Sequence, residues 1–182
     1  MPHGKRAKKP AQHLLEKITL CALFVISGIM PSFGDTDVLF SGSLVADPCI
    51  VDMNSEDQTV EFFPIVARHF SNNEQSYPAD FSIWLRGCDL SIGNQVIVTF
   101  YGDSDVNKSE YFALSGNVEG LALSITDSQG KAVKPNERQD AIMLTGPDNQ
   151  LKWQARLRST LGYGGVTEGE YVSVVTFLLE YE

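Results

Sequence analysis

The chain has 182 residues, of which 43% are hydrophobic and 20% are charged, and this length suits one globular domain rather than two. Its 14 basic and 23 acidic residues give a net charge of −9 at pH 7. The negative charge disfavours nucleic acid and anionic lipid as partners, because both would repel the chain.

The first 34 residues have the layout of a secretory signal peptide. Five basic residues precede the apolar run 18–30, which is too short to span a bilayer comfortably. The small residues that follow predict cleavage between Gly34 and Asp35. A membrane anchor is the alternative interpretation of this segment. Cleavage would leave 148 residues with 9 basic and 22 acidic side chains, which is a net charge of −13.

Export would place the chain in an oxidising compartment, where disulfides persist. Cleavage would remove Cys21 and leave Cys49 and Cys88, and two cysteines allow a single pairing. A redox-active pair is disfavoured because the two do not form a C-x-x-C motif. The predicted disulfide would close a loop of about 40 residues. Because it lowers the entropy of the unfolded chain, it would stabilise the folded state by roughly 4 kcal/mol at most.

From position 35 onward the sequence predicts strands and turns, without a helix of three turns. Short β-branched and aromatic runs alternate with turn residues at a spacing typical of a β-sandwich. Pro64 indicates an edge or a bulge in its region, and 71–80 is expected to be a polar loop. The predicted strand regions are, in chain order, 38–45, 49–51, 59–66, 81–86, 95–101, 111–114, 121–126, 141–144, 151–157 and 169–182.

The last predicted strand contains no proline and reaches the final residue of the sequence. Alternation places Val175, Phe177, Leu179 and Tyr181 on one face. The opposite face is also apolar in its middle, so the strand is expected inside a packed sandwich. Its next neighbour is expected to come from an earlier part of the chain or from another chain.

The first predicted strand after the cleavage site has an apolar face as well. A period of two places Val38, Phe40, Gly42 and Leu44 together. This strand could pair within its own domain, or it could lie along another molecule, as in strand addition at a sheet edge. The residues alone leave both interpretations open and favour the first.

Several short segments follow one another in a characteristic order after position 35. They are VLFSGSLV at 38–45, PCIV at 48–51, FSIWL at 81–85 with Cys88, VIVTFYG at 96–102, ALSG at 113–116, GLALSI at 120–125 with Asp127, Gly169 and the penultimate Tyr181. Together they resemble the pilins of the chaperone–usher pathway, of the type 1 and P-pilus kind. The resemblance covers the whole chain after the cleavage site, and it rests on the ordered set because no single segment is specific.

This resemblance implies an incomplete immunoglobulin-like β-sandwich of six strands, whose seventh strand is supplied by a chaperone or a neighbouring subunit. It implies that Val38, Phe40, Gly42 and Leu44 form the face of a donor strand. Gly42 matches the small residue that must pass a narrow point of the recipient groove.

The resemblance also assigns a role to the last strand. Its matching positions are those by which a periplasmic pilus chaperone, an outer-membrane usher and neighbouring pilin subunits hold the strand. These positions are Gly169, Val175, Phe177, Leu179 and Tyr181.

The resulting prediction is a fimbrial subunit with three parts: a signal peptide (1–34), a donor-strand extension (35–47) and a pilin domain (48–182). The short stretch before Phe40 indicates a minor or adaptor subunit, and a terminating subunit is also open. The subunit is expected to pass through the periplasm to a surface fimbrium, without catalytic activity, cofactor or small-molecule substrate. The alternative is a self-contained secreted immunoglobulin-like module that binds a ligand through its loops.

The remaining polar residues do not predict catalysis. His69 would be the single histidine after cleavage, which argues against a Ser-His-Asp triad and a histidine-rich metal site, and it is expected in solvent. Residues 103–107 mimic the start of a calcium loop, but the positions that follow lack the required Gly and Glu, so a turn is expected. Trp84 and Trp153 could form a sugar-stacking platform, although core or sheet-face positions are favoured.

Overall fold

The computed structural model describes residues 38–44, 46–162 and 164–182. They belong to two units, of which the first includes 38–43 and the second spans 44–182, and each is described by itself. The predicted cleavage site between Gly34 and Asp35 lies outside the described residues. Within the described ranges, no helix has the length and apolar character needed to cross a membrane.

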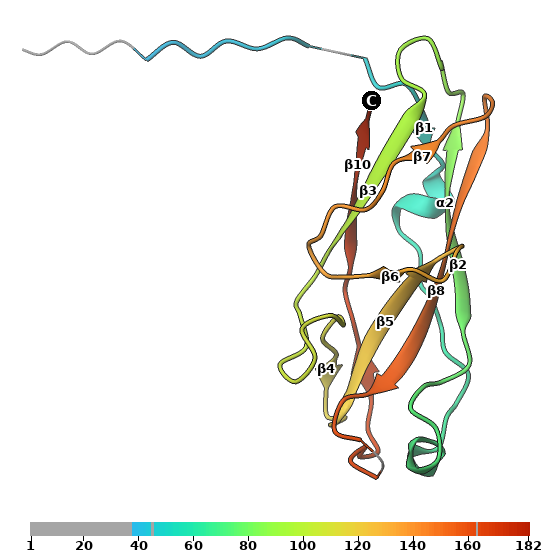
Figure 1. Ribbon diagram of the computed structural model, residues 1–182, viewed down its shortest axis with the longest axis vertical. Helices are drawn as coiled ribbons and strands as arrows, with labels where there is room; N and C mark the ends of the chain where they lie inside the picture. Colours follow the sequence, from blue (N-terminus) through green and yellow to red (C-terminus); the bar gives the residue numbers. More distant parts are fainter. Residues whose placement is uncertain (1–37, 45, 163) are drawn as a thin grey trace, which may run out of the picture. The chain divides into compact units, whose positions relative to one another are not determined.

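The larger sheet of the second unit has five strands in the order β1-β2-β8-β5-β6, and all neighbouring pairs are antiparallel (Figure 1). The strands are β1 (Ile50–Val51), β2 (Ala79–Arg86), β8 (Asn149–Ser159), β5 (Leu121–Asp127) and β6 (Ala132–Val133). Along β8, buried side chains alternate with more exposed ones from Asn149 to Leu157. This period of two is the pattern of a sheet that has one face on a core.

The second sheet has three strands in the order β10-β3-β7, and a two-stranded sheet joins β4 to β9. The strands are β10 (Thr176–Tyr181), β3 (Gln95–Tyr101), β7 (Ile142–Met143), β4 (Ser115–Gly116) and β9 (Tyr171–Val172). Five consecutive residues of β3 are buried, and β3 lies between two other strands. Its continuous run of β-branched and aromatic residues suits this central position.

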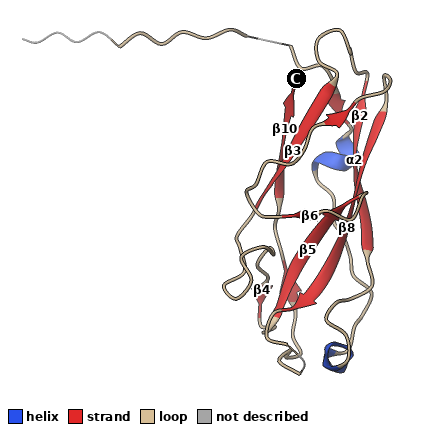
Figure 2. Ribbon diagram, viewed as in Figure 1, coloured by secondary structure: helices blue, strands red, loops and turns tan. Residues whose placement is uncertain are grey.

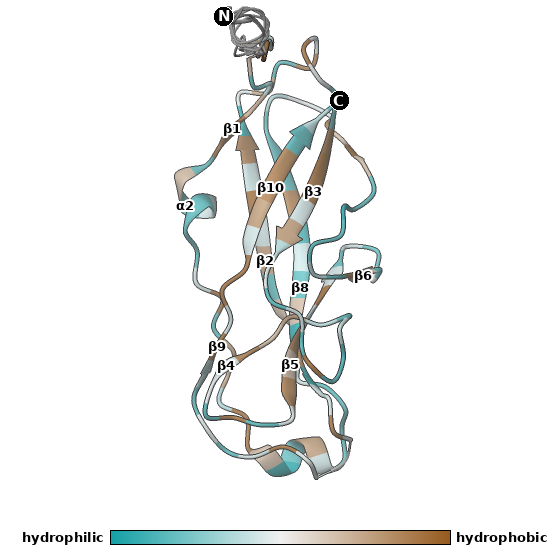
Figure 3. Ribbon diagram, turned by 90° about the vertical axis from the view of Figure 1, so that its left-hand side faces the viewer, coloured by the Kyte–Doolittle hydropathy of each residue, from teal (hydrophilic) through white to brown (hydrophobic). Residues whose placement is uncertain are grey.

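The two sheets pack face to face around an apolar core, and Figures 1 and 3 show them as two layers. Phe100 of β3 lies edge-on to Trp153 of β8, with ring centroids 5.1 Å apart, and Phe81 of β2 stacks on the same Trp153 at 5.9 Å. Trp153 is therefore a core residue, whereas Trp84 is partly exposed on the sheet and lies 4.4 Å beneath the guanidinium of Arg86. The predicted all-β sandwich is confirmed.

The predicted disulfide between Cys49 and Cys88 is present. Cys49 immediately precedes β1, and Cys88 follows β2 after one intervening residue. Two paired residues form a short ladder, so β1 gains little from hydrogen bonds alone. The disulfide holds this short strand against β2.

The helices are short (Figure 2). The single turn α2 (Met53–Glu56) is capped by the Asp52 carboxylate, which accepts a hydrogen bond from the Asn54 N–H at 3.0 Å. A 3-10 helix spans Ala67–Ser71. It contains His69, which is more enclosed than expected: the side chain is partly exposed, lies edge-on to Phe70, and places Nε2 3.1 Å from the Gln75 carbonyl oxygen.

Three of the predicted strands are wrong for the described chain. Residues 38–44 and 59–66 have no strand pairing, and 111–114 contain only isolated bridges of Phe112. Alternating side chains favour a strand, but the strand forms only where a second backbone supplies hydrogen bonds. In 59–66, Pro64 additionally lacks a donor.

The last strand also differs from its prediction. Its pairing is interrupted at 173–175, because β9 pairs with β4 whereas β10 pairs with β3. The expected burial of both faces is wrong as well: Val174 and Leu178 are exposed. The strand lies at the edge of its sheet, so only its inward face reaches the core.

Replacing both Cys49 and Cys88 with Ser should lower the free energy of unfolding by up to roughly 4 kcal/mol, because the unfolded chain regains the entropy of an open loop. Urea unfolding followed by tryptophan fluorescence measures the change. The reduced wild-type protein is the control and should match the double variant. Unchanged stability in both would contradict a stabilising disulfide.

Candidate functional site

The open side of β10 is the first feature that marks a functional site. β10 pairs with β3 on one side and occupies the end of its sheet. The backbones of Glu182 and Gln95 exchange hydrogen bonds in both directions, at 3.0 and 3.1 Å. Since bonded and non-bonded pairs alternate in an antiparallel ladder, the even-numbered residues of β10 bond to β3. The N–H and C=O groups of Phe177, Leu179 and Tyr181 therefore face the open side.

The side chains of these odd-numbered residues point to the core. Val175, Phe177, Leu179 and Tyr181 are partly buried and pack against the core residues of both sheets. Phe177 lies 6.5 Å from Phe100, measured between ring centroids. The open edge of β10 thus combines unpaired backbone groups with an apolar seam, which makes it a template for another strand.

The outer face of β10 is held in place near the end of the strand. Arg138 contacts two carboxylates on the outer face of the strand: its Nε lies 3.2 Å from Glu180 Oε2, and its Nη2 lies 2.7 Å from Glu182 Oε1. The hydrogen bond to Glu182, followed by the one to Glu180, raises the pKa of Arg138. All three side chains are substantially exposed, so each pair adds little stability. The contacts nevertheless fix the end of β10 against the adjoining loop.

Tyr181 carries a polar group at the seam. Its hydroxyl is buried and has no hydrogen-bond partner among the described residues. Burial, and secondarily the charge of Asp47, raises the pKa of Tyr181 above its ordinary value. A buried hydroxyl without a partner is unfavourable in the isolated chain.

Gly169 is part of the last predicted strand, but in the structure it lies in the loop that leads to β9. A Cβ at this position would approach the Asn117 Oδ1 to 2.6 Å and the Asn117 carbonyl carbon to 2.8 Å. The same Asn117 side chain accepts a hydrogen bond from the Glu170 N–H at 2.7 Å. The glycine is therefore required by a close approach of two loops.

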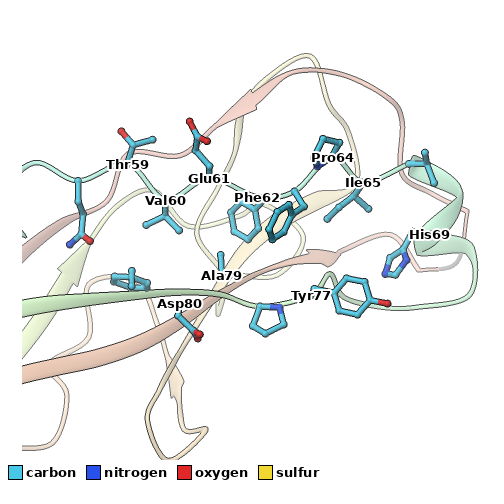
Figure 4. A pocket seen from close by; sticks show the side chains of 15 residues that line it. Thr59, Val60, Glu61, Phe62, Pro64, Ile65, His69, Tyr77, Ala79 and Asp80 are labelled. Atoms are coloured by element: carbon cyan, nitrogen blue, oxygen red, sulfur yellow. The ribbon is translucent and has the colours of Figure 1, made fainter.

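Residues 58–66 run beside β2 without forming a ladder to it, and a cavity of about 920 Å³ lies between them and residues 77–81. Figure 4 shows Val60 and Ile65 pointing across this space toward the strand that carries Ala79, whereas Thr59 and Glu61 point away. Val60 also packs against the core. The cavity lining contains no residue of β10, so the cavity and the open edge are separate features.

The residues predicted to form a donor face are all exposed. Val38 is 70% exposed, Phe40 90% and Leu44 103%. At Gly42, a Cβ atom in place of the glycine hydrogen would meet no other atom within 4 Å. The structure therefore leaves the apolar side chains of 38–44 available to another molecule.

The polar residues do not assemble a metal site in the described part of the chain. The Asp105 carboxylate accepts hydrogen bonds from the N–H groups of Asn107 and Lys108, each at 2.9 Å. These contacts are those of a tight turn. The turn expected at 103–107 is confirmed.

Sequence reasoning missed Arg138, which lies 42 residues before Glu180. It also missed the cavity beside 58–66. Neither feature has a local sequence signal, because both depend on segments that meet only in the folded chain.

Comparisons with known proteins agree with this geometry. The family model described as "Fimbrial protein" matches residues 38–182. The Fimbria A protein of Serratia marcescens is 30% identical over 149 residues, which cover 82% of this chain and 86% of the relative. The Major MR/P fimbria protein of Proteus mirabilis is 28% identical and covers 86% and 89%.

The fold is similar to that of solved pilus proteins. The crystal structure of the P pilus rod subunit PapA is 26% identical, has a TM-score of 0.67, and covers 75% of this chain and 100% of its own. The P pilus adaptor subunit PapF, at 14% identity and a TM-score of 0.52, shares the fold. The predicted immunoglobulin-like fold of the pilin type is confirmed.

Tyr181→Phe should raise the free energy of unfolding at pH 7 by roughly 1 kcal/mol, because it removes a buried, unpartnered hydroxyl. The exposed residue Tyr77 provides a matched control: Tyr77→Phe should change little.

The wild type should also lose stability as pH rises above about 10, where the unfolded chain releases the Tyr181 proton and the folded chain retains it. Urea unfolding across pH measures both effects. A Tyr181→Phe protein that loses as much unfolding free energy at high pH as the wild type would contradict the role of Tyr181 in this loss.

Proposed function

The chain belongs to the fimbrial protein family and is a subunit of a surface fimbrium, and we propose that it assembles by donor-strand exchange through the chaperone–usher pathway. The open edge of β10 carries this proposal. Its unpaired backbone groups and its inward apolar side chains belong to the same residues, Phe177, Leu179 and Tyr181. A single added strand would satisfy both.

The donor is the segment 38–44 of a second copy or of a related subunit. Its face consists of Val38, Phe40, Gly42 and Leu44, which alternate with residues that would point outward. Main-chain hydrogen bonds to β10 supply affinity, and the alternate side chains set the register. Gly42 suits a point where the two backbones approach closely.

The free energies involved support a donor strand that supplies both hydrogen bonds and apolar side chains. Each apolar donor side chain that becomes buried contributes about 1.5–3 kcal/mol. Three of them, with a ladder of hydrogen bonds, approach the whole stability of a small domain, which is roughly 5–15 kcal/mol. The subunit is therefore expected to be marginal alone and very stable once complemented.

An exposed apolar edge also explains the need for partners before assembly. A periplasmic chaperone would cover β10 after export and prevent edge-to-edge aggregation. An outer-membrane usher would then be the place where the donor strand of the next subunit replaces the chaperone. Val175 would extend this contact beyond the start of β10, and Gly169 would support it by allowing the close approach of the loops that precede β9.

The position of the subunit within the fimbrium is a separate question. The short stretch before Phe40 predicts a minor or adaptor subunit, and this stays a prediction. The similarity to proteins named as a major fimbria protein and a rod subunit favours a place in the shaft.

Leu179→Ser should reduce recovery of a one-to-one complex with the cognate pilus chaperone at least about tenfold, because it removes an apolar side chain from the open edge. Co-expression in the periplasm followed by size-exclusion chromatography measures the complex. The matched control is Leu178→Ser, on the outer face of the same strand, which should retain wild-type recovery. Equal losses in both variants would count against strand addition at β10.

Phe40→Ser should shorten the polymers formed on the cell surface, whereas Leu39→Ser on the alternate face should leave their length unchanged. Electron microscopy measures the length distribution. Deletion of 38–44 should abolish polymers while leaving the chaperone complex intact. A soluble, heat-stable monomer that forms without a chaperone would overturn strand exchange and favour a self-contained immunoglobulin-like binding module.

A further inference from the structure

A second cavity, of about 240 Å³, lies near the end of β8. In Figure 1 this end of β8 and the C-terminus lie at opposite ends of the 44–182 unit. The described residues that line the cavity come from three separate parts of the chain: Phe70 and Glu74, then Lys108 and Tyr111, then the stretch that begins at Arg158. The proposed strand exchange uses none of them.

The guanidinium of Arg158 is held in one orientation. Its Nε donates a hydrogen bond to the Tyr111 hydroxyl at 3.2 Å, and its Nη1 donates to the Gln75 Oε1 at 2.8 Å. The guanidinium carbon lies 5.5 Å from the centre of the Tyr111 ring. A planar donor group that is already oriented loses little entropy when it binds a carboxylate.

Hydroxyl groups also lie beside the cavity. The Ser159 hydroxyl donates to the Gly162 carbonyl at 2.8 Å, so its oxygen can still accept a hydrogen bond from a ligand. Thr160 lines the cavity but is only 8% exposed, and its Oγ1 is buried, so this hydroxyl is closed to a ligand. The Ser159 oxygen suits a ligand that carries hydroxyl groups.

The charges restrict the ligand further. Lys108 and Arg158 contribute two positive charges and Glu74 one negative charge, so the lining has an excess of one positive charge. A carboxylate with a single negative charge matches this excess, whereas a phosphate group carries about −1.5 to −2 and exceeds it. The Glu74 carboxylate can accept hydrogen bonds from ligand hydroxyls.

The cavity is small and mostly polar in its accessible lining. Its volume is below the ~300–1,000 Å³ of pockets for drug-sized molecules, so it suits one small ring. Phe70 lines the cavity but is only 2% exposed, so it offers a ligand little apolar contact. From these features we propose that the cavity binds an acidic monosaccharide through its carboxylate and its hydroxyl groups.

The test uses the full chain, exported and purified in the form in which it is recovered, as fimbriae or as a chaperone complex. Saturation-transfer difference NMR is recorded with N-acetylneuraminic acid, glucuronic acid, glucose and acetate as separate probes. At least one acidic sugar should give signals clearly stronger than those of glucose and acetate. Equal signals from glucose would overturn the requirement for a carboxylate, and equal signals from acetate would overturn the requirement for hydroxyl groups.

Variants locate the binding. Lys108→Gln and Ser159→Ala should each weaken binding of the acidic sugar, by roughly tenfold for the lost charged partner. Lys152→Gln is the matched control, because Lys152 is an exposed cation of the same strand β8 and lies outside the cavity lining. Unchanged binding in both cavity variants, or an equal loss in the control, would overturn the proposal. Polymer formation should be normal in all three, so this outcome is independent of strand exchange.

Discussion

Each residue of a strand directs its backbone N–H and C=O groups to one side, and a strand at the end of a sheet leaves every second residue without a partner. In β10 these residues are Phe177, Leu179 and Tyr181, and their side chains are also the ones that reach the core. The hydrogen bonds and the apolar cover are thus missing at the same place. One strand with alternating apolar residues can supply both.

The rest of the 44–182 unit keeps this edge in position. β3 bonds to the opposite side of β10, and Arg138 contacts its outer face through Glu180 and Glu182. Phe177 packs toward Phe100, which in turn packs on Trp153 of the larger sheet. An edge that is already ordered can accept a strand without a large loss of entropy, which favours tight association.

The two cavities have different structural causes. The larger one lies where 58–66 passes β2 without a ladder, so it results from backbone that has not found a partner. The smaller one is built from charged and hydroxyl side chains around Arg158. The first lies apart from the open edge of β10, whereas the second suits recognition of a small polar molecule.

Local sequence patterns were enough to predict the all-β class, the disulfide between Cys49 and Cys88, and the strands β2, β3, β5 and β8. They also predicted which side chains of β10 share a face, because a period of two is a local property, whereas contacts with the core show which face points inward. The folded chain was needed to show that 59–66 lacks a strand partner, that Arg138 reaches Glu180, and that Lys108 and Arg158 share a cavity. These features depend on contacts between segments far apart in the chain, and local periodicity carries no information about which segments meet.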